Sequence, residues 1–169
     1  MKFMMDIREK TALLHSAAEN TGYIKKLVEG TANIDGYAEY IYNLEAMYRA
    51  IENALDNNEN NDLVKPFVTK ELYRSELIVA YAYTRFLADL FGGRTFLSLL
   101  STGYKISIEG LNYYQFPNIS DLRGYVMKYH NMLGSINLVD DKKIDFINEV
   151  NNAYIYNLAI SNELDAKLK

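Results

Sequence analysis

The chain has 169 residues, of which 49% are hydrophobic and 24% are charged, as in an ordinary globular domain. Its 18 basic and 22 acidic residues give a net charge of −4, which disfavours nonspecific binding to nucleic acid. Cysteine is absent, so disulfides, thiolate catalysis and thiolate metal ligation are excluded, and a reducing, cytoplasmic location is expected. The first ten residues lack the apolar core of a signal peptide, and no apolar run is long enough to span a membrane.

Helical periodicity dominates the sequence and predicts an all-α fold, a single helical bundle over residues 1–169. The first helix is expected over about residues 6–19, with a weak point at 20–22 and a further apolar turn at 23–27. The second helix, over about 37–55, has the clearest apolar repeat. A solvated loop rich in Asn and Asp follows at 56–62, and a third helix is expected from about 69 to 93.

The second half predicts a short helical continuation at 95–100 and a mostly irregular stretch at 101–118. Residues 105–109 are the one weak candidate for a strand. Ser120 is expected to cap the next helix, which carries apolar residues from 122 to 133. Asp140 or Asp141 is expected to cap the last helix, whose apolar residues extend from 144 to 164.

The first helix carries a candidate metal ligand, His15. A histidine that binds iron through one ring nitrogen is commonly oriented through the other. Glu19 lies one turn later on the same face and could accept that second N–H, while Arg8 lies near the same stripe and could pair with a carboxylate of a ligand. A structural histidine with an incidental glutamate at i+4 remains the alternative.

The third predicted helix carries a second motif, in which Arg85 and Asp89 are four residues apart and Gly92-Gly93 follow. Glycines without side chains let a planar ligand lie directly against the helix backbone, and the nearby carboxylate could hold an ordered water. A helical ion pair followed by an ordinary glycine stop is the alternative. Taken together, the two motifs are what a pair of helices clamping a haem would require.

These motifs resemble the proximal and distal helices of biliverdin-forming haem oxygenases. The proximal match is Arg8-Glu-Lys-Thr followed by His15-x-x-Ala-Glu19-Asn, and the distal match is Ala82-Tyr-Thr-Arg85 followed by Asp89-Leu-x-Gly92-Gly93. Further matches follow in collinear order over nearly the whole chain: Tyr48 in the second helix, Glu109-Gly-Leu, Phe116-Pro-Asn-Ile119, and Ala153-Tyr-x-x-Asn157.

The resemblance implies oxidative opening of haem to biliverdin, carbon monoxide and ferrous iron, with O2 and electrons from an external reductase, ferredoxin or flavodoxin. Haem would be both substrate and cofactor, sandwiched between the two helices. By resemblance, His15 is the iron ligand and Asp89 orders distal water, supported by Arg85, Tyr48 and Asn157. The other residues implied to contact the haem are Glu19, Arg8, Tyr83, Ala88, Gly92, Gly93, Tyr114 and His130.

The sequence departs from the family pattern at several positions. Ala88 stands where glycine is usual, and Phe91 stands where a small residue is usual. His130 replaces a basic partner of a haem propionate, and Val126 replaces another, which makes the remaining contact weaker and dependent on pH. Between Ser75 and Glu76 the chain lacks a segment that the family fills with about two helices. This shortening would expose apolar surface and favour either a homodimer or a looser core.

Three functions therefore remain open from the sequence. The first is a compact haem oxygenase. The second is a haem-binding sensor, carrier or store of the same fold with weak turnover or none, because of Ala88, Phe91 and the missing segment. The third is a helical interaction protein in which His15 and Asp89 no longer act.

Overall fold

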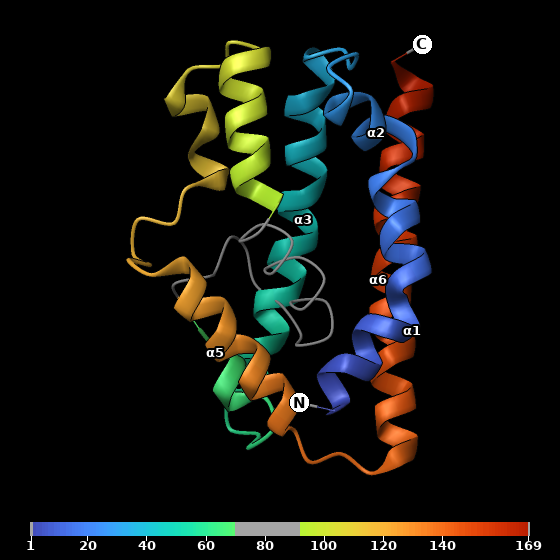
Figure 1. Cartoon of the computed structure of the whole chain (residues 1–169), viewed down its shortest axis with the longest axis vertical. Helices are drawn as coiled ribbons and strands as arrows, with labels where there is room; N and C mark the ends of the chain where they lie inside the picture. The colour runs from blue at the N-terminus through green and yellow to red at the C-terminus, as the bar shows by residue number, and fades with distance from the viewer. Residues whose placement is uncertain (1, 70–91, 169) are drawn as a thin grey trace.

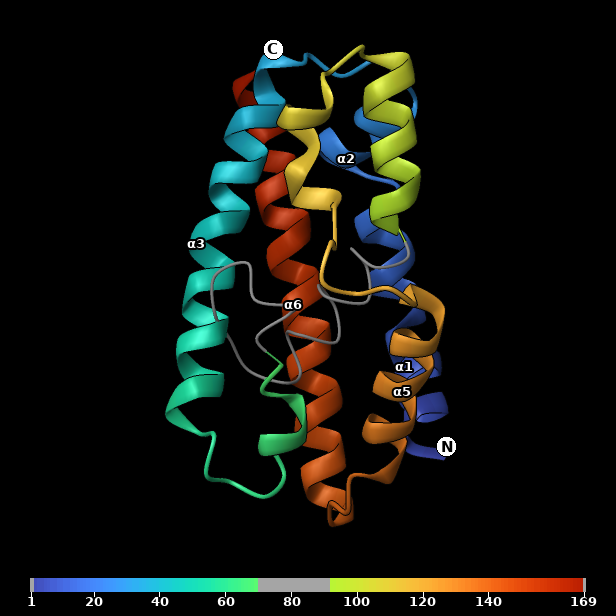
Figure 2. The same cartoon turned by 90° about the vertical axis from the view of Figure 1, so that its left-hand side faces the viewer.

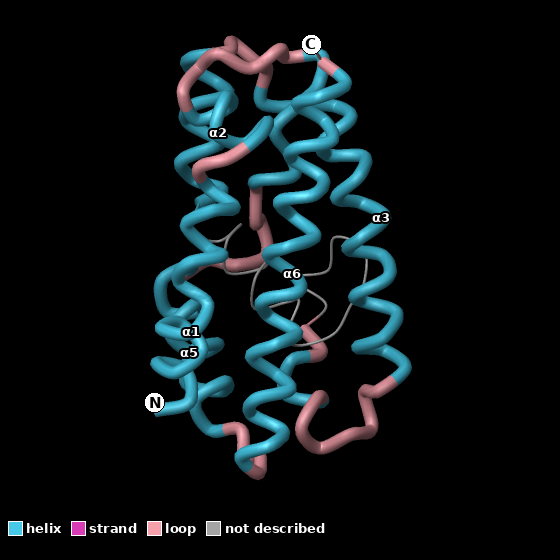
Figure 3. The backbone as a smooth tube through the Cα atoms, turned by 90° about the vertical axis from the view of Figure 1, so that its right-hand side faces the viewer, coloured by secondary structure: helices cyan, strands magenta, loops and turns pink. Residues whose placement is uncertain are grey.

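The computed structural model describes residues 2–69 and 92–168, in which all regular elements are helical (Figure 3). The described part of the chain contains no β-strand, which confirms the predicted all-α fold and excludes the weak strand candidate at 105–109. No helix in this part of the chain is long and apolar enough to cross a membrane. The predicted helix from about 69 to 93 lies almost wholly outside the described residues.

The long helices agree with the apolar periodicity of the sequence. Their bounds are Lys2–Glu19 for α1, Gly22–Val28 for α2, Asp35–Asn57 for α3, Leu122–Ser135 for α5 and Asp140–Lys167 for α6. Residues 92–98 are also helical and continue into a π-helical turn, η3, at Leu99–Gly103. Two 3-10 segments complete the described elements, η1 at Lys65–Phe67 and η4 at Ile108–Tyr114.

Helices α1 and α6 lie side by side and run in the same direction, although more than a hundred residues separate them in the sequence (Figure 1). The ring of Phe3 packs edge-on against that of Phe146, with centroids 5.5 Å apart. Nearer the C-terminal end of α6, Asp165 forms an ion pair with Lys26 of α2, the helix that follows α1, at 2.5 Å between Nζ and Oδ1. The two contacts follow the same order along both parts of the chain. Helices α1 and α2 therefore pack beside α6 and form one continuous wall of the bundle with it.

A glycine at the junction of α1 and α2 lets α2 pack closely against α6. Gly22 has φ of +59°, and a Cβ atom there would lie 2.7 Å from the backbone carbonyl of Ser161. The Ser161 hydroxyl donates to the carbonyl of Thr21 and accepts from the amide of Ile24, at 3.1 and 3.0 Å. The weak point predicted at 20–22 is therefore a bend that Ser161 stabilises.

Helix α3 runs opposite to α6 and forms the left-hand edge of the bundle in Figure 2. One face of α3 is buried, as its three- and four-residue apolar repeat predicts. The buried apolar residues are Tyr37, Tyr40, Leu44, Tyr48, Ile51 and Leu55. This repeat is the sequence feature that fixes the position of Tyr48 in the interior.

Three local predictions are wrong. The N-cap of α5 is Asp121 and not Ser120, because the Asp121 carboxylate accepts a hydrogen bond from the Gly124 amide at 2.9 Å. The N-cap of α6 is Val139, so Asp140 and Asp141 lie in the first turn, where their charges favour the positive end of the helix dipole. The stretch predicted to be irregular contains η4, whose 3-10 turns have no 3.6-residue apolar repeat to reveal them.

Candidate haem site

His15 lies on α1 with a partly open imidazole ring. Its side chain is 49% exposed, and Nδ1 lies 3.6 Å from Oε2 of Glu19 one turn later. The ring also packs edge-on against Tyr154 of α6, with centroids 5.3 Å apart and the planes at 83°. Because Nδ1 faces the carboxylate, Nε2 is the nitrogen that could bind a metal. The predicted approach of Glu19 to His15 is thus present, and the role of His15 as an iron ligand stays a prediction.

Arg8 of α1 and His130 of α5 interact electrostatically across two neighbouring helices. Burial lowers the pKa of the half-buried His130, and the positive charge of Arg8 lowers it further. Arg8 itself is exposed. Their electrostatic interaction places the two side chains in the same region of the fold. Both residues were predicted to hold haem propionates, and that role stays a prediction.

Tyr48 of α3 is fully buried and pairs with a tyrosine of η4. The hydroxyl of Tyr113 donates to that of Tyr48 at 2.9 Å, and the two rings meet edge-on with centroids 6.0 Å apart. The sequence predicted a role for Tyr48 but none for Tyr113. The contact spans 65 residues, and one tyrosine among the chain's 15 carries no local signal that would single it out.

The two predicted glycines have different surroundings. A Cβ atom at Gly93 would lie 3.1 Å from Cδ1 of Tyr114, whereas a Cβ atom at Gly92 would meet no described atom within 4 Å. Phe96, one turn after Gly92, stacks on Tyr114 with centroids 5.9 Å apart. The missing side chain at Gly93 therefore admits the Tyr114 ring. Close approach of a haem to either glycine stays a prediction.

Asn157 lies half-buried on α6, one turn after Ala153, to whose carbonyl its Nδ2 donates at 2.7 Å. It shares α6 with Tyr154, the aromatic neighbour of His15. Four other predicted site residues lie outside the described residues: Tyr83, Arg85, Ala88 and Asp89.

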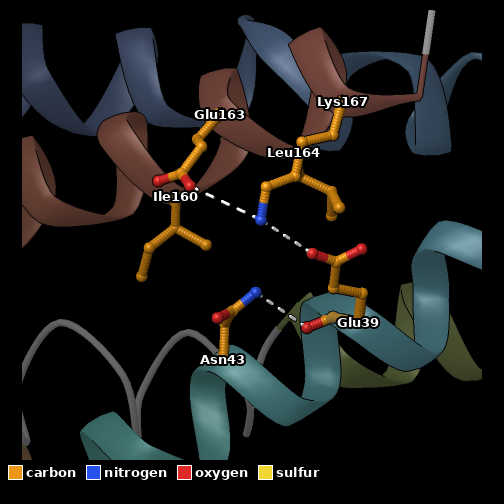
Figure 4. Close-up of a pocket in the computed structure, with 6 residues that line it drawn as sticks. All are labelled: Glu39, Asn43, Ile160, Glu163, Leu164 and Lys167. Carbon is orange, nitrogen blue, oxygen red and sulfur yellow. Dashed lines mark hydrogen bonds and ion pairs between the residues drawn. The ribbon is translucent and has the colours of Figure 1, made fainter.

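A shallow surface hollow with a volume of only about 30 Å³ lies between α3 and the C-terminal part of α6 (Figure 4). Lys167 lies between two carboxylates there, with Nζ 3.0 Å from Glu39 and 3.5 Å from Glu163. Asn43 donates to the backbone carbonyl of Glu39 at 2.9 Å. None of the predicted haem contacts lines this hollow, and its ion pairs join the outer ends of the two helices.

Solved structures share this fold. The crystal structure of heme oxygenase-1 from the cyanobacterium Synechocystis sp. PCC6803 in complex with heme superposes with a TM-score of 0.91 at 21% identity, covering 99% of this chain and 94% of that one. The structure of heme oxygenase from Leptospira interrogans gives a TM-score of 0.88 at 24% identity, covering 96% of this chain and 100% of that one.

Sequence comparison identifies the family. The family model described as "Heme oxygenase" matches residues 1–78 and 74–163. The heme oxygenases of Guillardia theta and Porphyra purpurea are each 26% identical to this chain, covering 95% and 96% of it and 85% and 86% of their own lengths. The chain belongs to the haem oxygenase family.

The same comparisons show that the chain is a shortened member. The alignment with the Guillardia theta protein extends over 202 positions, more than the 169 residues of the whole chain. The relative therefore has residues without a counterpart here. The two parts of the family match meet at residues 74–78, which agrees with the predicted loss of a segment between Ser75 and Glu76.

Proposed function

We propose that this protein binds haem through His15 and opens it oxidatively to biliverdin, carbon monoxide and ferrous iron. O2 and electrons from an external reductase, ferredoxin or flavodoxin would complete the reaction. Membership of the haem oxygenase family supports the reaction class. The observation that carries the assignment to this site is the half-open imidazole of His15, whose Nδ1 faces Glu19 and whose Nε2 is left to bind iron.

The described residues fit a haem in both charge and chemistry. A neutral imidazole is a good iron ligand, and a carboxylate beside its other nitrogen favours the tautomer with the proton on Nδ1. Arg8 would supply a cationic side chain for one propionate, and His130 would supply an imidazole that can donate a hydrogen bond to the other. The bound haem would supply the redox chemistry, while the protein holds and orients it.

The distal side of the site is assigned from the family pattern. Asp89 would order water above the macrocycle, and Arg85 would hold the Asp89 carboxylate in place. Tyr48 is suited to this network because its hydroxyl is buried and already belongs to a hydrogen-bonded pair. Asn157, from α6, would add a polar group.

The first experiment is an absorption titration with hemin, followed in the same cuvette by ascorbate or a reductase with catalase present. We expect a Soret band at one equivalent that decays into the broad absorption of biliverdin. His15→Ala should lose the Soret band of the wild type. His130→Gln, which changes the other histidine of the chain, should keep the histidine-ligated spectrum.

Each other result would contradict a different part of the proposal. A Soret band that persists under reducing conditions would show a haem-binding protein without turnover, as Ala88, Phe91 and the missing segment would favour. An unchanged band in His15→Ala would exclude His15 as the ligand. The electron donor, a homodimer and a cytoplasmic location stay predictions.

A further inference from the structure

His15 packs against an aromatic residue of another helix, Tyr154 of α6. The centroids of the two rings lie 5.3 Å apart, and the ring planes meet at 83°. Tyr154 is only 8% exposed, whereas the side chain of His15 is 49% exposed. One side of the imidazole therefore lies against a buried aromatic ring, while about half of the side chain is open to a ligand.

The plane of a histidine ring depends on the groups that surround it. The χ2 torsion of histidine has broad wells, so the side chain alone defines this plane only loosely. Glu19 restrains the His15 ring weakly, because the distance of 3.6 Å from Nδ1 to Oε2 exceeds that of a hydrogen bond and the Glu19 side chain is 63% exposed. The carboxylate thus favours a proton on Nδ1 but leaves the ring plane to a stiffer neighbour.

Tyr154 can provide this stiffness because the core holds its part of α6. Ala153 and, one turn earlier, Val150 are fully buried. Helix α6 is also joined to α1 by the edge-on packing of Phe146 on Phe3. Rotating the Tyr154 ring out of its place would carry buried apolar surface into water. The position of this ring beside the imidazole is therefore fixed by the packing of the bundle.

We propose that Tyr154 is a positioning residue that sets the plane of the His15 imidazole before haem binds. The inference rests on the proposed function, because it concerns the ring that would bind the iron through Nε2. Neighbours that orient a ligating histidine also tune the metal that it holds. An imidazole donates π-electron density perpendicular to its own plane, so a fixed plane would make the directions around a bound haem electronically different in one defined way. Tyr154 would act through His15 and need not contact the haem.

The alternative is that Tyr154 only fills space between α1 and α6. Phe146 offers a matched control, because it packs edge-on against Phe3 between the same two helices, with centroids 5.5 Å apart. Phe3 precedes His15 by 12 residues, which is about 18 Å along a helix. Tyr154→Leu removes the flat ring beside the imidazole, Phe146→Leu removes the distant one, and Tyr154→Phe keeps the ring without its hydroxyl.

The first measurement uses the haem-free protein and does not depend on activity. In a His130→Gln background His15 is the only histidine, so NMR assigns its imidazole C–H signals directly. We expect a nuclear Overhauser contact between the rings of His15 and Tyr154, and imidazole signals displaced by the ring current of the tyrosine. Tyr154→Leu should return these signals toward those of an unstructured histidine. Tyr154→Phe and Phe146→Leu should leave them displaced.

The second measurement uses the ferric hemin complex with cyanide. The spread of the haem methyl proton signals in this complex reports the plane of the axial imidazole. Tyr154→Leu should change that spread and raise the hemin dissociation constant roughly twofold to tenfold, the factor that the loss of one aromatic contact represents. Phe146→Leu should leave the spread and the dissociation constant close to wild type, although its urea midpoint should fall like that of Tyr154→Leu.

Three results would overturn the assignment of Tyr154 alone. The first is the absence of an Overhauser contact between the two rings in the protein with Tyr154 intact, which requires no variant of Tyr154 to fold. The second is a folded Tyr154→Leu protein whose imidazole and haem methyl signals keep their original positions. The third is a Phe146→Leu protein in which these signals move equally.

Failure of the proposed function would be recognised separately. A wild type that binds no hemin, or an unchanged Soret band in His15→Ala, would overturn that function. The haem-free imidazole signals would still decide whether Tyr154 orients the ring of His15.

Discussion

His130 is the predicted propionate partner whose charge depends most on its surroundings. Burial and the nearby Arg8 both disfavour its protonated form, so its pKa lies below the ordinary value in the folded protein. The unfolded chain then takes up a proton more readily than the folded one. Stability that is present above the ordinary histidine pKa of about 6.5 is therefore lost as the pH falls through that value toward the lowered pKa.

Arg8→Gln tests this electrostatic interaction. Removing the positive charge should raise the pKa of His130 toward its ordinary value and make the haem-free protein less sensitive to mild acid. An NMR titration of the imidazole C–H signals would measure it, since the chain has only two histidines and His15→Gln would assign them. Lys10→Gln, an exposed lysine of the same helix, is the control. Identical His130 titrations in Arg8→Gln and wild type would show that the two residues are not coupled.

The bend between α1 and α2 depends on a residue without a side chain. At Gly22 an alanine would meet both a strained backbone, at φ of +59°, and the carbonyl of Ser161 at 2.7 Å. At Gly30 the backbone is similarly left-handed, at φ of +74°, but a Cβ atom would meet nothing within 4 Å. Comparing alanine substitutions at the two glycines therefore separates the free-energy cost of the left-handed backbone from the cost of the steric clash with Ser161.

Gly22→Ala should lower the free energy of unfolding by about 2–5 kcal/mol, because it combines left-handed strain with a backbone clash. Gly30→Ala should lower it by only about 1 kcal/mol, the conformational part alone. Urea unfolding monitored by circular dichroism at 222 nm would compare them. Equal losses in the two variants would mean that contact with Ser161 does not limit the position of α2.

The start of α5 offers a second paired test. Asp121→Ala should cost about 1 kcal/mol of stability, because its carboxylate accepts a hydrogen bond from the first turn of the helix. Ser120→Ala should be close to neutral, since Ser120 is not the N-cap. The urea midpoints of the two variants would show which residue caps α5. A larger loss of stability in Ser120→Ala would mean that Ser120, the residue predicted from the sequence, is the N-cap.

The sequence predicts the long helices well and the segments between them poorly. Apolar residues spaced three and four apart predict the long helices α1, α3, α5 and α6. Only the first and last residues of these helices differ from the prediction. Ser120 and Asp121 are both good N-caps, so composition cannot choose between them. In η4 the residues Tyr113 and Tyr114 face different partners, and no period of 3.6 marks the segment.

In the candidate site, too, contacts within one helix can be predicted from the sequence, whereas contacts between segments far apart in the sequence cannot. The contact between His15 and Glu19 is predictable because residues four apart share a helix face. The edge-on contact of His15 with Tyr154 and the hydrogen bond between Tyr113 and Tyr48 join distant segments, so that only the fold reveals them. Without the family resemblance, the residues alone left an ordinary structural histidine as an open interpretation of His15.

The parallel pairing of α1 with α6 has a consequence for the order of events during synthesis. His15 emerges from the ribosome well before Tyr154, which packs on its ring and lies 139 residues later in the sequence. Contacts between such distant segments form late and slow the folding of a chain. A growing chain therefore carries His15 without its Tyr154 neighbour until α6 has been made, and the proposed iron ligand acquires this contact only after α1, α3 and α5 have been synthesised.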